Sequence, residues 1–364
     1  MQIAVFSGKR GGYGAMKPLL RHLQSHPVFE LSLILSDQHI NENFGNTQEE
    51  VKNDFPKYST LKMIQKNSSP DSRVDALSQM MRSAAIYLKK NKPDLVILYG
   101  DRSEVLTFAL ALIHFNIPIA HIQGGDTSGN IDDGIRHSLS HFAKYHFPSC
   151  DESKNKLIEL GIEKETICAV GDCHLDEIYS KNYPRYEETL HSLNIDIESK
   201  FCIFLLHPDT VNNINYNKII VPIIKYLLKI FHDVIAIYPC SDHGYGEIVD
   251  SLIKFKKNDN FHLYKNLDAP YFWSLMSRAK LFIGNSSAGI IETAAFKLPT
   301  VNIGERQKGR LRPNHIVDTN YDLSKIKEAI SKAMKFNFKE IKSPYGEGGA
   351  NLKIIKFLES KLLC

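Results

Sequence analysis

The feature that most constrains the fold is a regular alternation of short apolar runs with amphipathic stretches. Short runs rich in β-branched residues are typical of buried parallel strands. Strands that alternate with helices predict a doubly wound parallel α/β sheet. In the first half we expect strands at Gln2–Ser7, Leu31–Leu35, Leu95–Tyr99, Ile119–Ile122 and Ile167–Val170, and helices at Ala15–Gln24, Val74–Lys90, Val105–Phe115 and Ile135–Tyr145.

The alternation stops once and then begins again, which predicts two domains. A chain of 364 residues is also too long for one ordinary core. The polar stretch 179–200 contains Pro184 and no clear strand, so we expect a connector there. We therefore expect Rossmann-like domains at 1–178 and 201–345, and a C-terminal helix at 346–364 that can pack back on the first domain. The second series of strands is expected at Cys202–Leu206, Val234–Tyr238, Phe261–Tyr264, Leu281–Gly284 and Thr300–Ile303.

Composition and charge exclude several classes of protein. No apolar run reaches the length of about 18 residues that a membrane helix needs. The chain enters a strand at once, without a signal peptide, so we expect a cytoplasmic protein. The six cysteines form no C-x-x-C pair, which indicates reduced thiols. A formal charge of +4 without a clustered basic face suits an anionic small ligand and does not suggest nucleic acid.

The ends of the predicted strands are the places to look for function, because ligands of open α/β sheets bind beyond the carboxyl ends of the strands. The first strand runs into the glycine-rich turn Gly8–Gly14, which contains Arg10 and precedes a helix. Glycines let backbone amides approach a phosphate, and a helix amino terminus favours an anion. A tight turn with a solvated Arg10 is the alternative.

A second strand ends in Gly100, Asp101 and Arg102. A carboxylate and a guanidinium at this edge suit an acid or base and its anchor. A helix cap and a surface ion pair explain the same residues, so both interpretations stay open.

The next strand leads into an acidic, glycine-rich loop with Asp126, Asp132 and Asp133, followed by Arg136 and His137. Asp132 or Asp133 can cap the following helix. Capping does not explain Asp126 or the paired glycines before it. Like charges held close together push pKa values apart, which is how one site obtains both an acid and a base.

Three strand ends in the second half carry polar residues. His207 ends one strand and is followed by a proline; it is either a phosphate donor or acid, or a structural histidine. Ser286 and Ser287 follow another strand at the expected start of a helix, which predicts a diphosphate site. Glu292 lies further along that helix, within reach of ribose hydroxyls, and Arg306 follows the next strand. A serine N-cap with an incidental glutamate is the alternative.

No metal-ligand pattern is apparent, and no cofactor is expected. Taken in order, the strand-end motifs resemble the hydrolysing UDP-N-acetylglucosamine 2-epimerase family, of the type that opens sialic and legionaminic acid pathways. The motifs span nearly the whole chain. They are Gly100-Asp101-Arg102, Gly124-Gly125-Asp126, Asp132-Asp133-Gly134-Ile135-Arg136-His137, Leu206-His207-Pro208, Gly284-Asn285-Ser286-Ser287-Ala288-Gly289 and Gly304-Glu305-Arg306-Gln307.

The resemblance implies a GT-B architecture, with two domains facing a cleft and UDP held mainly by the second. It implies anti elimination of UDP to a 2-acetamidoglycal and addition of water that leaves C2 inverted. It further implies a UDP-sugar substrate and a homodimer or homotetramer. By motif, the catalytic set comprises Asp101, Asp126, Asp132, Asp133 and His207. The substrate and UDP set comprises Arg10, Arg102, Arg136, His137, Ser286, Ser287, Glu292 and Arg306, and His207 is expected near the UDP as well.

Two positions depart from the family pattern. The family usually has glutamate where this chain has Asp126, and a displacement of about 1 Å can cost about 100-fold in rate. It commonly has an acidic residue where this chain has Gly12, which suggests an altered sugar or an altered outcome.

Four functions fit these motifs. The first is a hydrolysing 2-epimerase acting on UDP-N-acetylglucosamine or on a UDP-2,4-diacetamido-2,4,6-trideoxyhexose, which feeds nonulosonic acid biosynthesis. The others are a nucleotide-sugar hydrolase that retains C2, a GT-B glycosyltransferase and a non-enzymatic sensor. The acidic loop around Asp126 argues against the transferase, because transfer needs fewer carboxylates.

Overall fold

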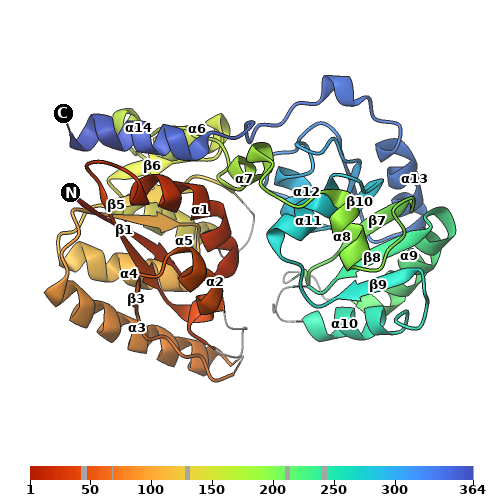
Figure 1. The fold of residues 1–364 in the computed structure, drawn as a ribbon, viewed down its shortest axis with the longest axis horizontal. Coiled ribbons are helices and arrows are strands. Elements are labelled where there is room, and N and C mark those ends of the chain that lie inside the picture. The colour runs from red at the N-terminus through yellow and green to blue at the C-terminus, as the bar shows by residue number, and fades with distance from the viewer. Residues whose placement is uncertain (42–46, 68, 128–131, 210–213, 240–243, 364) are drawn as a thin grey trace. The chain divides into compact units, whose positions relative to one another are not determined.

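The computed structural model describes residues 1–364 apart from 42–46, 68, 128–131, 210–213, 240–243 and 364. Its contacts divide the chain into two compact units (Figure 1). Unit 1 consists of Met1–Thr127, Ile131–Asp176 and Tyr345–Cys364, and unit 2 is built on Glu177–Pro344. Each unit has its own hydrophobic core and its own six-stranded sheet.

The sheet of unit 1 is wholly parallel, in the order β3-β2-β1-β4-β5-β6. This is the strand order of a Rossmann domain, with a change of direction between β1 and β4. Successive residues of β1 enter opposite cores: Ile3 packs on the α1 side and Ala4 on the α3 side. Burial on both faces explains why the strands read as continuous apolar runs. The strands are β1 (Gln2–Ser7), β2 (Glu30–Leu35), β3 (Ser59–Thr60), β4 (Leu95–Tyr99), β5 (Ile119–Ile122) and β6 (Tyr145–Phe147).

Helices cover both faces of this sheet. The C-terminal helix α14 lies beside α1 in Figure 1, and Leu20 of α1 and Ile354 of α14 belong to one core cluster. The carboxylate of Asp176 caps α14 by accepting from Ala350 N at 3.0 Å and Asn351 N at 2.9 Å. The helices of unit 1 are α1 (Arg10–Gln24), α2 (Thr47–Asp54), α3 (Pro70–Lys90), α4 (Ser103–His114), α5 (Asp132–Phe142), α6 (Asp151–Glu159), α14 (Ala350–Leu362) and the start of α7 (His174–Ser180), with short 3-10 turns at Asp37–His39 and Lys164–Thr166.

Unit 2 repeats the same topology. Its parallel sheet has the order β12-β11-β10-β7-β8-β9, so the change of direction falls between β7 and β10. The strands are β7 (Phe201–Leu205), β8 (Asp233–Ile237), β9 (Phe261–Tyr264), β10 (Leu281–Gly284), β11 (Thr300–Ile303) and β12 (Ile316–Thr319). The helices are α8 (Tyr186–Ser192), α9 (Tyr216–Ile230), α10 (Tyr245–Ile253), α11 (Ala269–Met276), α12 (Ala288–Ile291) and α13 (Leu323–Ala333), with a 3-10 turn at Phe338–Glu340. Two doubly wound sheets confirm the predicted fold class.

Several local expectations were wrong. Ile167–Val170 is not a strand; Ile167 forms only an isolated bridge with His146. The sixth strand is Tyr145–Phe147, and α5 ends at Phe142 before it, whereas the pattern extended the helix to Tyr145. No glycine or proline separates α5 from β6, so the sequence gives no local stop for the helix. The expected connector 179–200 contains α8, and the hydroxyl of its buried Thr189 accepts a hydrogen bond from Ser274 Oγ of unit 2 at 2.7 Å.

Four buried histidines are held neutral by burial, which lowers their pKa to about 4 for His39, His121 and His315 and to about 3 for His146. Below the ordinary histidine pKa, the unfolded chain binds protons that the folded chain does not bind. We therefore expect the free energy of unfolding to fall as pH drops from about 6.5 towards 4. The urea midpoint, followed by circular dichroism across this range, tests the prediction.

The variant His121→Gln keeps an amide donor for the carbonyl of Gly100. It removes one of the four buried histidines that have a lowered pKa. Its urea midpoint should depend less steeply on pH than that of the wild type. His22→Gln, at an exposed position of α1, is the control. Equal slopes in His121→Gln and the wild type would contradict the assignment of His121 to the acid-sensitive set.

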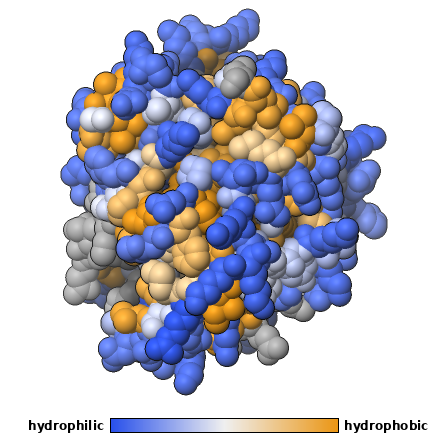
Figure 2. All heavy atoms as spheres, turned by 90° about the vertical axis from the view of Figure 1, so that its left-hand side faces the viewer, coloured by the Kyte–Doolittle hydropathy of each residue, from blue (hydrophilic) through white to orange (hydrophobic). Residues whose placement is uncertain are grey.

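The surface of the molecule, seen from the side of unit 1 in Figure 2, carries hydrophilic side chains around smaller apolar patches. Scattered apolar surface is normal for a folded domain. Among the residues that the structure describes, no helix is long and apolar enough to span a bilayer.

Candidate active site

In unit 1 the change of strand direction brings the ends of β1 and β4 together. Strands β1 and β4 are neighbours in register, with Val5 opposite Ile97. Lys9 follows the end of β1, and Asp101 follows the end of β4. In doubly wound folds this change of direction opens a crevice for ligands. The sequence-predicted residues Asp101 and Arg102 therefore lie at the position that the topology favours for a site.

Arg136 is the centre of an ionic cluster at this edge. Its guanidinium is buried and donates to the carboxylate of Asp101 and, at 2.6 Å, to that of Asp133. It also donates to the backbone carbonyl of Asp126 at 2.6 Å. Burial opposes the charge of Arg136, but the carboxylates of Asp101, Asp126 and Asp133 outweigh it, so its pKa is raised. Arg136 thus joins the end of β4 to the loop after β5 and to the start of α5.

Asp132 begins α5 next to this cluster. Burial is the main cause that raises its pKa, and the negative charge of Asp101 adds to it. The cations Arg136, Arg102 and Lys9 oppose the rise. A carboxyl whose pKa is raised beside an ion-paired carboxylate is the arrangement from which acid and base roles arise.

Asp126 has a carboxylate that is tied to α6. Its Oδ1 accepts from the hydroxyls of Ser149 at 2.8 Å and Ser153 at 2.6 Å, and the residue is 7% exposed. Gly125 before it has a φ of +81°, and a Cβ there would lie 2.1 Å from the carbonyl oxygen of Ser153. The loop therefore approaches the first turn of α6 so closely that only glycine fits at position 125.

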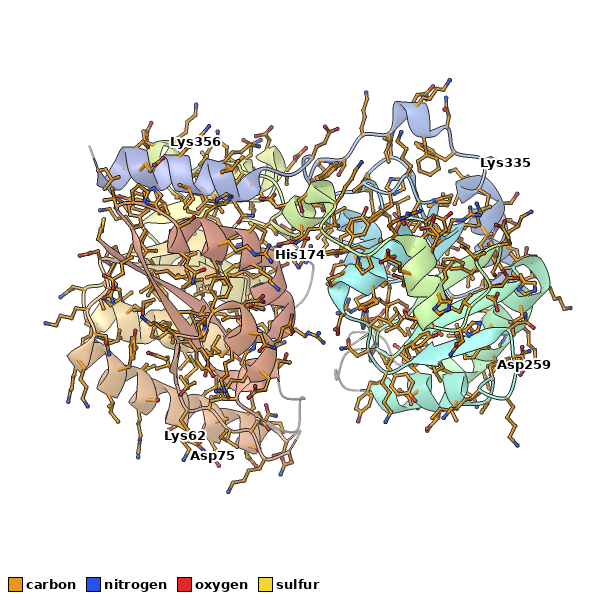
Figure 3. The ribbon with its side chains drawn as sticks, in the orientation of Figure 1. Lys62, Asp75, His174, Asp259, Lys335 and Lys356 are labelled. Carbon is orange, nitrogen blue, oxygen red and sulfur yellow. The ribbon has the colours of Figure 1, made fainter. Side chains whose placement is uncertain are left out.

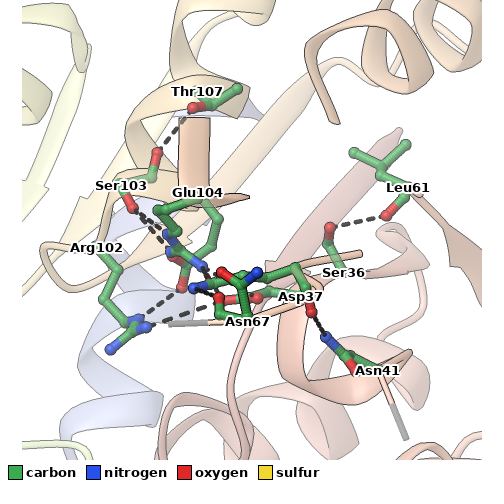
Figure 4. Close-up of polar contacts among 11 residues, drawn as sticks. Ser36, Asp37, Asn41, Leu61, Asn67, Arg102, Ser103, Glu104 and Thr107 are labelled. Atoms are coloured by element: carbon green, nitrogen blue, oxygen red, sulfur yellow. Dashed lines mark hydrogen bonds and ion pairs between the residues drawn. The ribbon is translucent and has the colours of Figure 1, made fainter. Parts of the chain in front are cut away.

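Arg102 is part of a second ionic network (Figure 4). Its Glu104 packs against the turn after β1, since a Cβ at Gly8 would lie 2.6 Å from Glu104 Cγ. Arg102 Nε donates to Glu104 at 2.9 Å, and Arg73 donates to Glu104 at 2.6 Å and to Asp37 at 3.2 Å. The charge of Glu104 is the main cause that raises the pKa of Arg102. Burial opposes the charge of Glu104, but Arg102 and Arg73 lower its pKa on balance, so both partners remain charged. We infer that this network holds the backbone that follows Asp101 in place.

The sequence also predicted Arg10 and His137 as contacts of the substrate. Arg10, in the first turn of α1, donates from Nε to Glu50 of α2 at 2.9 Å. His137 has a buried Nδ1 without a hydrogen-bond partner in the described structure, and burial lowers its pKa.

In unit 2 the corresponding change of direction brings together the ends of β7 and β10. Asn285 bridges them: the backbone N of His207 donates to Asn285 Oδ1 at 2.6 Å, and Asn285 Nδ2 donates to the carbonyl of His207 at 2.9 Å. Gly284 has a φ of +153°, and a Cβ there would lie 1.8 Å from the carbonyl oxygen of Leu205. The glycine lets β10 approach β7 closely enough for Asn285 to form the bridge.

The residues predicted to bind UDP gather around Asn285. The carbonyl of Asn285 accepts from Arg306 Nη1 at 3.3 Å and from Gln307 Nε2 at 3.1 Å. Ser287 is the N-cap of α12, but its side chain accepts no capping hydrogen bond. Simple helix capping therefore does not account for Ser287.

The helix after these serines is shorter than the sequence pattern suggested. It is the single turn Ala288–Ile291, so Glu292 follows the helix and does not lie within it. The carboxylate of Glu292 accepts from Trp273 Nε1 of α11 at 2.8 Å. This contact orients Glu292, and only the tertiary structure reveals it.

Sequence reasoning missed four residues at these edges. Lys9 and Asn285 stand inside the quoted motifs but were given no role, and Glu104 was not considered. His121 was also missed: its Nε2 lies 2.7 Å from the carbonyl oxygen of Gly100, which positions the residue before Asp101. A polar residue inside an apolar strand was the only signal for His121.

A further polar group comes from the start of α7, where Figure 3 labels His174. The buried carboxylate of Asp172 lies 3.0 Å from His174 Nδ1 and accepts from Gln123 Nε2 at 3.0 Å. The hydroxyl of Tyr99, at the end of β4, lies 3.2 Å from His174 Nδ1. No group of three or more histidine, cysteine, aspartate or glutamate side chains suited to a metal occurs among the described residues.

The fold and these two strand-edge clusters are those of a GT-B-like protein built from two Rossmann-like domains. Residues 21–359 match the family model described as UDP-N-acetylglucosamine 2-epimerase. The chain belongs to the UDP-N-acetylglucosamine 2-epimerase family, which confirms the resemblance of its motifs.

Similar proteins include several 2-epimerases. The chain is 31% identical to the UDP-N,N'-diacetylbacillosamine 2-epimerase (hydrolyzing) of Legionella pneumophila, over 99% of this chain and 96% of that protein. It is 29% identical to the UDP-N-acetylglucosamine 2-epimerase of Neisseria meningitidis, over 98% and 94%. The crystal structure of UDP-GlcNAc 2-epimerase from Neisseria meningitidis bound to UDP-GlcNAc has a similar fold, with a TM-score of 0.83 at 19% identity and coverage of 99% of this chain and 100% of that chain.

Proposed function

We propose that this protein is a hydrolysing 2-epimerase, which releases UDP from a UDP-2-acetamido sugar and yields the free sugar with C2 inverted. The observation that carries the proposal is the pair Asp101 and Asp132 at the β1/β4 edge. One carboxylate is ion-paired with Arg136, and the pKa of the other is raised by burial. Relatives of about the same length that are named hydrolysing 2-epimerases support the same assignment.

In the proposed reaction, unit 1 acts on the sugar. A carboxylate takes the proton from C2 while the C1–O bond to UDP breaks, which forms a 2-acetamidoglycal. Water then adds at C1 and a proton returns to C2 on the other face. Because Asp101 is ion-paired with Arg136, we assign it the role of base, and we assign Asp132, whose pKa is raised, the role of acid in rehydration.

We assign Asp133 and Asp126 supporting roles. Asp133 shares Arg136 with Asp101, and the carbonyl of Asp126 accepts from the same guanidinium. Because the carboxylate of Asp126 accepts from two serine hydroxyls, its shorter side chain suits an anchor of the loop. Arg10, Arg102 and His137 remain proposed contacts of the substrate.

Unit 2 is proposed to hold UDP. Departure of a diphosphate needs fixed donors for the charge that develops on it. His207, Ser286, Ser287 and Arg306 lie around Asn285 at the β7/β10 edge, and Glu292 is proposed for the ribose.

The sugar is proposed to be a 2,4-diacetamido-2,4,6-trideoxyhexose or N-acetylglucosamine. Relatives at 31% identity are named for diacetylbacillosamine, and one at 29% is named for N-acetylglucosamine. The inverted product suits an enzyme that condenses a free 2-acetamido sugar with a three-carbon acid, as in the synthesis of nonulosonic acids.

The test is incubation with UDP-N-acetylglucosamine and with its 2,4-diacetamido-2,4,6-trideoxy counterpart in D2O, followed by proton and phosphorus NMR. Release of UDP with an inverted C2 that carries deuterium is expected for at least one of them. Release of UDP with C2 retained and protonated would indicate a plain hydrolase. If UDP were released only when an acceptor is present, the protein would be a glycosyltransferase.

Ser287→Ala is expected to weaken binding of UDP by about tenfold or more, because a hydrogen bond to a charged group contributes about 1.5–3 kcal/mol. Turnover at saturating substrate should change less. Calorimetric titration with UDP measures the affinity, and Ser192→Ala at the end of α8 is the control. Unchanged affinity in Ser287→Ala would remove this hydroxyl from the diphosphate site.

A further inference from the structure

Trp273 brings a fixed hydrogen-bond donor into unit 2. It lies on α11, is the one tryptophan of the chain and is 5% exposed. Its ring packs edge-to-face on that of Tyr183, with 6.4 Å between the centroids, and Tyr183 packs in turn on Phe296 at 6.1 Å. The hydroxyl of the next residue, Ser274, donates to Thr189 of α8 at 2.7 Å. These contacts hold the indole, and so the direction of its N–H, in place.

The acceptor of this N–H is Glu292. Trp273 Nε1 donates to Glu292 Oε2 at 2.8 Å. An indole N–H is a neutral donor with a single proton, whereas a carboxylate accepts at about four positions. The contact therefore orients the carboxylate without cancelling its charge, and it uses only part of the capacity of Glu292 to accept hydrogen bonds.

The backbone places Glu292 one helical turn beyond a serine proposed for the diphosphate. Ser287 is the N-cap and Glu292 the C-cap of the short helix α12, and both have an αR backbone. Glu292 N donates to the carbonyl of Ala288 at 3.0 Å. At a rise of about 1.5 Å per residue, the α-carbons of Ser287 and Glu292 are separated by about 7.5 Å along the helix axis. In a nucleoside diphosphate the ribose follows the phosphates directly, so a carboxylate at this position suits the ribose hydroxyls.

We propose that Trp273 is a positioning residue of the nucleotide site. Its indole holds the carboxylate of Glu292 where it accepts from the 2′- and 3′-hydroxyls of a ribose, so that the site selects ribonucleotides over 2′-deoxyribonucleotides. This inference rests on the proposed function for the assignment of Glu292 to the ribose. A site built to hydrogen-bond a hydroxyl discriminates strongly against a ligand that lacks it, because the acceptor is left unpaired. Loss of the indole N–H frees the acceptor from its fixed direction, so this discrimination should fall.

The first experiment is calorimetric titration with UDP and with 2′-deoxy-UDP. The wild-type protein should bind UDP more tightly by about tenfold or more, because the missing hydrogen bond is one to a charged group. Trp273→Phe keeps an aromatic ring but has no N–H, and its preference for UDP should be smaller by about fivefold. Tyr271→Phe, at an exposed position of α11, is the matched control and should keep the wild-type preference. A wild-type preference in Trp273→Phe would overturn the proposal.

A double variant distinguishes positioning from general packing. In the Glu292→Ala background, Trp273→Phe should change the affinity for UDP by less than about twofold, because the carboxylate that the indole orients is gone. If Trp273→Phe weakened UDP binding by the same factor in both backgrounds, the ring would act only through packing, and the proposal would be wrong.

The third measurement leaves Trp273 in place, so it does not depend on the folding of a tryptophan variant. The fluorescence of the one tryptophan reports on its contact with Glu292 directly. Glu292→Gln replaces a charged acceptor at 2.8 Å by a neutral amide and should shift the emission maximum of the protein without nucleotide. Tyr271→Phe should leave the maximum unchanged. Coincident spectra of Glu292→Gln and the wild type would refute the contact on which the proposal stands.

None of these measurements needs turnover, so they separate this inference from the proposed reaction. Equal affinity of the wild-type protein for UDP and 2′-deoxy-UDP would overturn this inference alone and leave the proposed reaction in place. A preference for UDP that falls in Trp273→Phe, in a protein that does not invert C2, would support this inference and count against the proposed reaction alone.

Discussion

Replacing Asp101 by asparagine is expected to lower the rate of UDP release by about 10²–10⁴-fold, the contribution typical of a positioned acid or base. Asparagine has nearly the same shape but cannot take a proton from C2 near neutral pH. The protein should still bind UDP with unchanged affinity, because the proposed diphosphate site lies in unit 2. Initial rates of UDP release and calorimetric titration with UDP measure the two quantities.

The control for this prediction is Asp133→Asn, because Asp133 is the other carboxylate partner of Arg136. If Asp101 carries the proton, Asp101→Asn should be far slower than Asp133→Asn. If the rate of UDP release falls by the same factor in both variants, Asp101 acts only by orienting Arg136. Wild-type turnover in Asp101→Asn would exclude Asp101 from the mechanism.

The second large effect is expected for Arg136→Met. The guanidinium is 1% exposed and satisfies the carboxylates of Asp101 and Asp133 and the carbonyl of Asp126. Methionine fills a similar volume but leaves two carboxylates close together without their cation. Breaking a buried ion pair in this way typically costs about 3–5 kcal/mol. We expect unit 1 to lose that much stability and the protein to lose turnover.

Urea unfolding followed by circular dichroism measures the loss of stability. Arg136→Lys keeps the charge but cannot donate to three acceptors at fixed angles. Its stability to urea should therefore lie between that of the wild type and that of Arg136→Met. Arg185→Met is the control, because Arg185 forms an exposed pair with Glu187, and its unfolding should not change measurably. If Arg136→Met were as stable as the wild type, the cluster would not hold the edge of the sheet together.

The fold could be predicted because its signals are local. Each buried strand is an apolar run with turn residues beside it, and each of these features can be recognised within a few residues. The prediction was wrong where local signals are weak. Tyr145–Phe147 follows α5 without a stop signal, and its status as a strand depends on pairing with β5. Ile167 looks like a strand residue but pairs only through one bridge with His146.

The candidate site residues could be proposed for a similar reason, but the contacts among them could not be predicted. The ends of buried strands can be located from the sequence, so Asp101, Asp132 and Ser287 could be named. Contacts such as Glu292 with Trp273, or Asp126 with Ser153, join residues that are 19 and 27 positions apart. Which side chains meet at such distances along the chain depends on packing, which no local pattern encodes.

The amino-acid sequence by itself therefore determined two features of this protein: the repeated strand–helix alternation that makes two Rossmann-like domains, and the polar residues that follow the strands. The tertiary structure alone decided how those residues are used. The order β2-β1-β4-β5 places the turn after β1 beside the end of β4, and α5 lies where its Arg136 contacts Asp101. Strand order is a non-local property, because hydrogen bonds between strands and burial of both sheet faces select the neighbours. The electrostatic environment of each carboxylate is set only after those neighbours are in place.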